Sequence, residues 1–263
     1  MLPAILTLNI SRPPVQRARL LLDYLWHREE ELLVLTETGR GGGSELIGQV
    51  CRAAGYAVES SLHAPDGRRR PGLSATSLGV LVVGRGVSVT RIADLAPPLL
   101  PERTLALEVP AASGPVRLIA AYGPASDPLR YASAGQRQRK REWLLGLCTW
   151  LSALPPAPTL VVGDLNIVAP GHRDALPYVL PEETTAYEVL TSGLGLVDVY
   201  AAAHVGSPDA AEPSWVDHSG AGCRYDYVLA TADVAPGVWT ACLDQTPRTR
   251  GLTDHGALAA SLS

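Results

Sequence analysis

The sequence lacks the cysteine spacings that are typical of zinc sites and of small disulfide scaffolds. Its four cysteines, Cys51, Cys148, Cys223 and Cys242, are widely separated and show neither CxxC nor CxxH spacing. This scatter argues against a zinc site and against a disulfide framework. We therefore expect four reduced thiols.

An excess of positive charge is also absent, because the formal net charge is −4 and Lys140 is the only lysine. Proteins that coat nucleic acid rely on many Lys and Arg side chains to neutralise phosphates. The arginines either reflect the composition of the source or supply forked donors for phosphate groups. This balance excludes a nucleic-acid-coating protein but is compatible with an enzyme that contacts its substrate transiently.

We also expect no leader segment, membrane span, repeat or long linker. The opening stretch, MLPAILTLNI, is apolar but short and has no basic leader, so we expect neither a signal peptide nor a membrane partner. Pro and Gly are spread along the chain, which predicts one domain over residues 1–263. We expect a cytoplasmic protein without an obligate protein partner.

What the sequence does contain is a set of apolar runs that alternate in groups with a few amphipathic segments. The strand-like runs are Ile5–Ile10, Leu32–Thr36, Leu78–Val83, Val87–Ile92, Leu105–Val109, Val116–Tyr122, Leu160–Val162, Tyr225–Leu229 and Ala257–Leu262. Helical periodicity covers Pro14–Arg28, Ser44–Ala54, Ala132–Leu151 and Glu182–Thr191. Grouped strands with few helices favour a four-layer α/β (α+β) sandwich, in which two mostly antiparallel sheets lie face to face beneath outer helices.

Carboxylate and amide side chains end three of these runs. Asn9 ends ILTLN, Glu37 ends LVLTE, and Asp164 and Asn166 end TLVVGDLN. Positions i and i+2 of an extended segment point the same way, so Asp164 and Asn166 can face one small volume. For any one of these residues alone, an ordinary turn residue is the favoured explanation.

Two further segments near the C-terminus carry candidate groups. Asp226 lies inside the apolar run RYDYVLA, and Asp254 and His255 precede the final run in LTDHGALAASL. If Asp226 accepts a hydrogen bond from His255, the imidazole is oriented and its protonated form is favoured. The alternative is a surface histidine beside a capping aspartate.

Taken together, these groups match the needs of phosphodiester hydrolysis. Hard oxygen ligands suit Mg²⁺ or Mn²⁺, and the reaction requires a metal that offsets oxyanion charge and a group that orients water. The sequence contains candidates for each part.

The motifs LNI, LTET, AYGP, VVGDLN, SWVDH, RYDYVLA and TDH resemble, in the same order, the signatures of the endonuclease/exonuclease/phosphatase superfamily. The stretch LPEETTAYEVLTSGLGLVDVY and the later PSWVDHSGAGCRYDYVLA resemble its exodeoxyribonuclease III branch, which contains DNA-repair exonucleases and abasic-site endonucleases. The resemblance spans almost the whole chain.

This resemblance implies a metal site and a water-activating pair. Glu37 would be the principal ligand of Mg²⁺, with Mn²⁺ as a substitute. Asn9, also at the metal site, would help position the metal or the nucleophile, and Asp254 would complete the metal set or support its ligands. Asp164 would align or deprotonate the attacking water, and Asn166 would orient the nucleophile and the phosphate.

The same resemblance implies phosphate and substrate contacts. His255, steadied by Asp226, would stabilise the scissile phosphate, and Tyr122 would hydrogen-bond the phosphate or the leaving oxygen. Trp215 would lie against the nucleotide or abasic sugar, although a lone Trp is also typical of a core. Arg224 would reach a phosphate, or else form an ordinary ion pair.

Two basic groups could touch a DNA backbone. One is the loop triplet Arg68–Arg70, which is the better candidate. The other comprises Arg137, Arg139, Lys140 and Arg141 on the long helix, where Leu144 and Leu147 mark the core face. We therefore predict that the helix residues form a solvated exterior.

The loops depart from the branch pattern. NISRPPVQRAR replaces an Asn-Gly-type turn, YGPAS replaces a Gly- or Asn-rich continuation, and Thr253 stands where Ser is commoner. Such loops decide which phosphoester fits a site. We predict a DNA 3′-exonuclease or abasic-site endonuclease; the alternatives are a phosphatase or phosphodiesterase for a small or lipid phosphoester, and a non-catalytic binding module.

Overall fold

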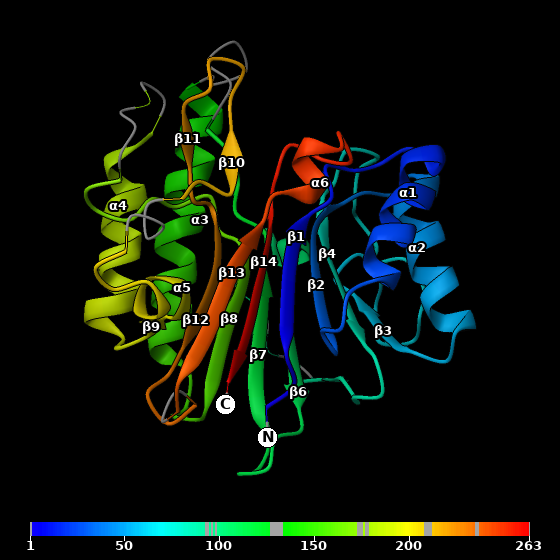
Figure 1. Ribbon diagram of the computed structural model, residues 1–263, viewed down its shortest axis with the longest axis horizontal. Coiled ribbons are helices and arrows are strands. Elements are labelled where there is room, and N and C mark those ends of the chain that lie inside the picture. The colour runs from blue at the N-terminus through cyan, green and yellow to red at the C-terminus, as the bar shows by residue number, and fades with distance from the viewer. Residues whose placement is uncertain are drawn as a thin grey trace.

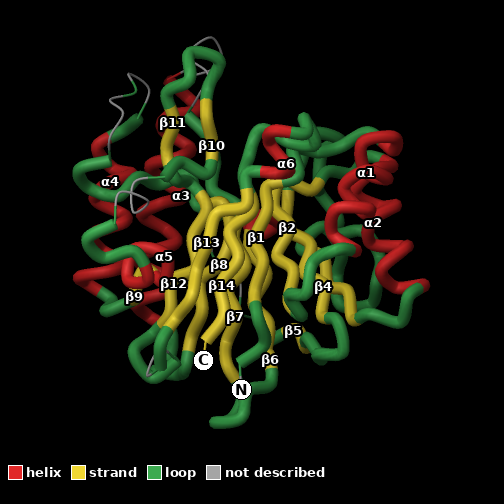
Figure 2. Tube along the Cα trace, viewed as in Figure 1, coloured by secondary structure: helices red, strands yellow, loops and turns green. Residues whose placement is uncertain are grey.

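The computed structural model consists of two six-stranded β-sheets packed face to face, with helices on both outer surfaces (Figures 1 and 2). It describes residues 2–262 except residues 93, 94, 96, 98, 127–133, 173–175, 177, 178, 208–211, 235 and 236. The four-layer architecture expected from the sequence is confirmed.

The first sheet has the order β13-β14-β1-β2-β4-β3. Its strands are β1 (Ile5–Asn9), β2 (Leu32–Thr38), β3 (Ala57–Ser60), β4 (Gly79–Gly84), β13 (Trp239–Asp244) and β14 (Ala257–Leu262). The helices α1 (Val15–Trp26) and α2 (Gly42–Ala53) cover its outer face (Figure 1).

The second sheet has the order β5-β6-β7-β8-β12-β9. Its strands are β5 (Thr90–Arg91), β6 (Thr104–Val109), β7 (Val116–Ala121), β8 (Thr159–Asp164), β9 (Val197–Asp198) and β12 (Asp226–Ala230). A 3₁₀ turn (Pro101–Arg103) precedes β6, and β10 (Trp215–Val216) pairs with β11 (Gly222–Cys223) in a separate hairpin. The outer helices of this sheet are α3 (Ala134–Ala153) and α4 (Pro181–Glu188), and α4 continues as a π-helical turn (Val189–Gly193). Two short helices complete the fold: α5 (Val199–Ala203) follows β9, and α6 (Thr246–Thr249) lies between β13 and β14.

Each sheet contains one parallel pair at its centre. In the first sheet β1 is parallel to β2, and in the second β7 is parallel to β8, while the other paired strands are antiparallel. A parallel pair needs a crossover connection, which α1 and α3 supply. The sheets are therefore mostly antiparallel, as predicted.

The central strands are buried on both faces, which explains their continuous apolar runs. In β1, Ile5 packs between the sheets and Leu6 packs beneath the helices of the first sheet. In β8, Val162 lies in the inner layer and Val161 packs beneath α3. Alternate residues of a strand thus fill two different layers of core.

Some predicted elements need correction. The run Val87–Ile92 contains only the two-residue strand β5, because the chain bends at residues 85–87. The helix expected over Ala132–Leu151 begins at Ala134 among the described residues, and Ala132 lies outside them. All four cysteines lie within the described residues and none forms a disulfide, as expected. In the described part of the chain, no helix combines the length and apolar character that a membrane crossing requires.

Lys140 on α3 is buried, which contradicts the prediction that the basic residues of this helix are all solvated. Its side chain is 0% exposed, and Nζ lies 2.7 Å from Oε1 of Glu183 and 3.2 Å from Oγ of Ser126. Arg137, Arg139 and Arg141 are exposed, as predicted. Lys140 therefore links α3 to α4 and to the segment after β7.

The strand directions bring the candidate groups to one end of the sandwich. Because β1 and β2 are parallel, Asn9 and Glu37 lie at the same end of the first sheet. In the second sheet β8 ends at Asp164 exactly opposite the start of β12, where Asp226 is its register partner. His255 lies just before β14, which runs antiparallel to β1. Five separate segments thus converge where α6 and the β10–β11 hairpin lie (Figure 1).

Candidate active site

The end of β8 holds Asp164 and Asn166 in a tight turn. Oδ1 of Asp164 accepts hydrogen bonds from the backbone nitrogen of Asn166 at 3.0 Å and from its Nδ2 at 2.9 Å. Asn166 adopts a left-handed φ of 51°, which Asn tolerates better than most residues. Gly163 has φ 138°, and a Cβ there would lie 2.1 Å from the carbonyl oxygen of Ala121. The GDLN motif therefore fixes the Asp164 carboxylate against β7.

Asn9 joins Asp164 to Glu37. Its Nδ2 donates to Oδ2 of Asp164 at 2.8 Å and to Oε2 of Glu37 at 3.1 Å. Its Oδ1 accepts from the backbone nitrogen of Ser11 at 2.8 Å. Asn9 therefore presents nitrogen to the two acids and aligns their carboxylates. Its place in the metal set stays a prediction.

Glu37 has a strained backbone at an irregular point of β2. Its φ is 53°, and the register of β2 with β4 shifts between Leu35 and Thr38. A bulge re-aims a side chain, and left-handed non-glycine residues are concentrated at functional sites. Burial raises the pKa of Glu37, with a further increase from Asp254, while hydrogen bonds from Asn9 and Tyr122 and the charge of His255 oppose the shift. Glu37 thus occupies a partly desolvated, negatively charged site.

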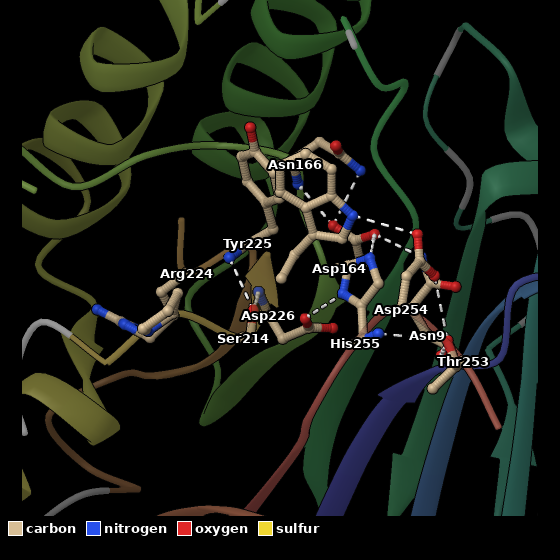
Figure 3. A network of polar contacts seen from close by, with 12 residues as sticks. Asn9, Asp164, Asn166, Ser214, Arg224, Tyr225, Asp226, Thr253, Asp254 and His255 are labelled. Carbon is tan, nitrogen blue, oxygen red and sulfur yellow. Dashed lines mark hydrogen bonds and ion pairs between the residues drawn. The ribbon is translucent and has the colours of Figure 1, made fainter. Parts of the chain in front are cut away.

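His255 and Asp226 form the predicted pair (Figure 3). The distance between Nδ1 of His255 and Oδ2 of Asp226 is 2.7 Å, and Nε2 lies 3.9 Å from Oδ2 of Asp164. Burial lowers the pKa of His255, but the charge and hydrogen bond of Asp226 and the charge of Asp164 outweigh it and raise the pKa to about 10. The imidazole is therefore protonated near neutral pH.

Asp164 is buried between these groups. Burial, together with the charge of Asp226, raises its pKa to about 8, although His255 and Asn9 favour the ionised form. A carboxylate with a pKa close to the working pH is well suited to accept a proton.

Trp215 and Thr253 hold Asp254. Nε1 of Trp215 donates to Oδ2 of Asp254 at 3.2 Å. Oγ1 of Thr253 lies 3.3 Å from Oδ1 of Asp254 and 2.7 Å from the carbonyl oxygen of Asn9. Trp215 is only 9% exposed and its ring centroid lies 5.6 Å from that of Tyr225. Trp215 therefore contacts the predicted metal ligand Asp254. Its predicted substrate contact stays a prediction.

Solved structures with a similar fold include an AP endonuclease from Archaeoglobus fulgidus, with 20% identity and a TM-score of 0.74 over 100% of both chains. The 3′-5′ exonuclease NExo from Neisseria meningitidis is also 20% identical, with a TM-score of 0.74 over 99% of both chains. The APE2 catalytic domain of Xenopus laevis is 16% identical, with a TM-score of 0.69 over 98% of this chain and 91% of that one. The chain has the endonuclease/exonuclease/phosphatase fold. Neither a protein-family model nor a curated protein matches the sequence.

Tyr122 lies directly after β7, which ends at Ala121. Its side chain is buried, and burial together with the charge of Glu37 raises its pKa well above the ordinary value. The phenol is therefore neutral, and it donates its hydrogen bond to Glu37. Its contact with a phosphate stays a prediction.

Arg224 does not face the site, which corrects its predicted role in substrate binding. Nη1 and Nη2 lie 3.2 and 2.6 Å from the two carboxylate oxygens of Asp198, and both side chains are almost fully buried. The guanidinium also stacks on Tyr227 and Tyr200, and Figure 3 shows it pointing away from His255. Of its two predicted roles, the structure supports the ion pair.

The loop arginines have mixed surroundings. Arg69 forms an ion pair with Glu45, and Arg68 is exposed with Asp66 as its neighbour. No contact of Arg68–Arg70 with the residues of the candidate site is seen among the described interactions. Their role in DNA binding stays a prediction.

Sequence reasoning missed two residues that shape this site. Oγ of Ser214 accepts from the backbone nitrogens of Tyr225 and Asp226, at 3.0 and 3.2 Å, and so fixes the start of β12. Arg103 stacks on Tyr122, with its guanidinium carbon 4.6 Å from the ring centroid. The only signal for Arg103 in the sequence is its position two residues before the apolar run Leu105–Val109.

The donors at this end of the sandwich fit a hard divalent cation. No group of three or more His, Cys, Asp or Glu side chains in the described part of the chain could enclose a metal on its own. Mg²⁺ does not need such a cage, because it is usually bound by one or two carboxylates together with water and substrate oxygens. Glu37 and Asp254, whose charge raises the pKa of Glu37, supply such a pair.

Proposed function

We propose that the protein is a divalent-metal-dependent phosphodiesterase that hydrolyses DNA, as a 3′-exonuclease or an abasic-site endonuclease. The observation that carries this proposal is the joining of Glu37, Asn9 and Asp164 by hydrogen bonds, with His255 beside them. The fold supports it, since the AP endonuclease and the exonuclease named above share the architecture.

Asp164 is the group that would accept a proton from the attacking water. Its Oδ1 is held by Asn166 and its Oδ2 by Asn9, so both oxygens have fixed directions. The raised pKa of about 8 makes the carboxylate a better proton acceptor than an exposed Asp. In-line attack on phosphorus needs a water whose direction is set by such a group.

His255 would donate a hydrogen bond to a non-bridging phosphate oxygen. Asp226 occupies Nδ1, which leaves Nε2 as the donor on the side of Asp164. A protonated imidazole also offsets the negative charge that develops during the reaction. Tyr122 would add a neutral phenol, whose hydrogen bond to Glu37 would pass to the phosphate when substrate binds.

Glu37 and Asp254 would hold Mg²⁺, with Mn²⁺ as a substitute. When bound there, the cation would stabilise the developing charge on the phosphate oxygens. Asn9 keeps Glu37 aligned from one side, while Trp215 keeps Asp254 aligned from the other.

DNA is the substrate class favoured by the neighbouring structures, one of which is a 3′ phosphatase from Neisseria bound to a product DNA hairpin. That protein is 20% identical to this chain, with a TM-score of 0.75 over 99% of both chains. Small phosphoesters are the competing substrates, because the loops depart from the exodeoxyribonuclease III pattern.

The test compares both substrate classes under one set of conditions. A 5′-labelled duplex with an internal abasic site, an undamaged duplex and a panel of small phosphomonoesters and phosphodiesters are incubated with enzyme and Mg²⁺, with and without EDTA. We expect faster cleavage of DNA, abolished by EDTA. Faster turnover of a small phosphoester would overturn the substrate class, and no cleavage of any substrate with Mg²⁺ or Mn²⁺ would overturn the proposed hydrolysis.

A further inference from the structure

Arg103 contacts the candidate site but has no part in the chemistry described so far. It ends the 3₁₀ turn before β6, and its carbonyl oxygen accepts a hydrogen bond from the backbone nitrogen of Tyr122 at 2.8 Å. Its guanidinium carbon lies 4.6 Å from the centroid of the Tyr122 ring. Arg103 therefore contacts both the backbone and the ring of Tyr122.

The guanidinium also reaches two consecutive carbonyl groups. Nη1 of Arg103 donates to the carbonyl oxygen of Tyr122 at 3.3 Å and to that of Gly123 at 3.2 Å. The Gly123 oxygen is also the acceptor for Nδ2 of Asn166, at 3.1 Å. The same Nδ2 donates to Asp164 at 2.9 Å. One carbonyl oxygen thus connects Arg103 to the pair that would orient the attacking water.

Gly123 is held closely enough to transmit this contact. Its backbone nitrogen donates to the carbonyl oxygen of Asp164 at 2.8 Å. A Cβ on Gly123 would lie 2.1 Å from the carbonyl oxygen of Leu165, so no larger residue fits without a shift. The peptide between β7 and the GDLN turn therefore has little room to move.

We propose that Arg103 is a positioning residue for the proposed hydrolysis. It sets the Tyr122 ring by stacking, and it sets the Asn166 amide through the Gly123 carbonyl that both residues share. A planar guanidinium suits this place, because it can stack on a ring and donate in its own plane, whereas an ammonium group cannot do both. Small displacements of reacting groups reduce rates strongly. Loss of Arg103 therefore slows the chemical step and leaves substrate affinity unchanged.

Arg85 offers a matched control far from the site. Its guanidinium also lies over aromatic rings, those of Trp26 and Tyr56, at 5.9 and 5.7 Å. It also donates to two carbonyl oxygens, of Arg28 at 2.7 Å and of Leu25 at 2.6 Å. Arg85 follows the end of β4 that pairs with the start of β2, which is the opposite end from Glu37.

The experiment measures kcat and KM on the abasic duplex for Arg103→Met, Arg103→Lys and Arg85→Met, with the melting temperature of each. This inference rests on the proposed function, so the kinetic comparison requires that the wild type cleaves DNA. We expect Arg103→Met to lower kcat at least tenfold with KM within twofold, and Arg103→Lys to restore kcat only in part. Arg85→Met lowers the melting temperature but leaves kcat within twofold.

A double-variant comparison separates positioning from direct contact. Arg103→Met should lower kcat much less in an Asn166→Ala background than in the wild type, because the shared contact is already lost. A rise in KM with unchanged kcat would overturn the proposal in favour of a phosphate contact. Full additivity with Asn166→Ala would overturn it as well, as would equal kcat losses in Arg103→Met and Arg85→Met.

A readout without substrate keeps this inference apart from the proposed function. Arg103→Met should shift the carbonyl ¹³C resonance of Gly123 and the side-chain amide resonances of Asn166, and Arg85→Met should leave both in place. Unchanged resonances in Arg103→Met would contradict the shared contact. If the wild type cleaves no DNA while these resonances move, the proposed function fails and the positioning contact stands.

Discussion

Nδ1 of His255 lies 2.7 Å from Oδ2 of Asp226, although Asp226 is in a strand of the second sheet and His255 leads into a strand of the first. Asp226 begins β12 in the second sheet, and His255 lies two residues before the start of β14 in the first. The pair therefore ties the two sheets together at the end of the sandwich that holds Glu37 and Asp164. It also fixes which imidazole nitrogen remains for a phosphate.

The pH dependence of kcat tests this pair. Asp164 must be ionised, so activity rises as the pH increases through its pKa of about 8. A bound cation stabilises the ionised carboxylate and would move this rise to lower pH. His255 must be protonated, so activity falls as pH rises through about 10. Asp226→Asn removes the charge that raises the pKa of His255 and should move the alkaline limb to lower pH by at least about one unit. An alkaline limb that stays in place would contradict this role, and Asp217→Asn, in an exposed turn, serves as the control.

Arg224→Met should reduce stability and leave substrate affinity intact. The variant leaves Asp198 as an unpaired buried charge, which costs about 3–5 kcal/mol in comparable cases. Urea unfolding measures the loss, and KM for the abasic duplex should stay within about twofold of the wild type. A raised KM with unchanged stability would restore the substrate-binding role that the sequence predicted.

Lys140→Met should destabilise the protein for a similar reason. The change leaves the buried Glu183 carboxylate without its cationic partner. Its Oε1 still accepts hydrogen bonds from Ser126 and from the backbone nitrogen of Leu180. We expect a loss of about 3–5 kcal/mol, and partial recovery in the double variant with Glu183→Gln, which removes the stranded charge. Arg139→Met, on the exposed face of the same helix, should change stability by less than about 0.5 kcal/mol. Equal effects of the two single variants would contradict the burial of Lys140.

Trp215→Phe should weaken metal binding more than DNA binding. The change removes the indole donor to Asp254 while keeping an aromatic ring in the core. Groups that orient metal ligands typically affect metal affinity by about 10–100-fold. Calorimetric titration with Mn²⁺ measures this affinity without substrate, and Trp26→Phe on the exposed face of α1 is the control. A higher KM for DNA with unchanged Mn²⁺ affinity would instead support a direct substrate contact.

Much of the fold could be predicted from sequence because the central strands are buried on both faces. β1, β2 and β8 carry unbroken apolar runs that end in Asn9, Glu37 and Asp164, and these endings marked the site. β3 and β13 were missed, because they are edge strands whose residues are largely half-buried or exposed. Their pairing depends on neighbours that are distant in the sequence, and no local pattern reports it.

The candidate site was predictable in its acids and histidine but not in its arginines. Asp164 and Asn166 interact within one turn, so their spacing was informative. Whether Arg224 faces a phosphate or the core depends on Asp198, which lies on another strand. Arg103 reaches the site only because β6 and β7 pair, with Thr104 opposite Ala121. Such contacts arise from the sheet register, which single-sequence patterns do not fix.

The central claim is that Asp164 activates water for phosphodiester hydrolysis, and a single-turnover assay tests it most directly. The cleavage rate of the abasic duplex is measured with saturating Mg²⁺ for the wild type, Asp164→Asn and Asp233→Asn, an exposed residue in the turn that follows β12. The proposed role predicts that Asp164→Asn lowers the rate by about 10²–10⁴-fold, with the fold intact, while Asp233→Asn matches the wild type. A rate for Asp164→Asn within threefold of the wild type would contradict it.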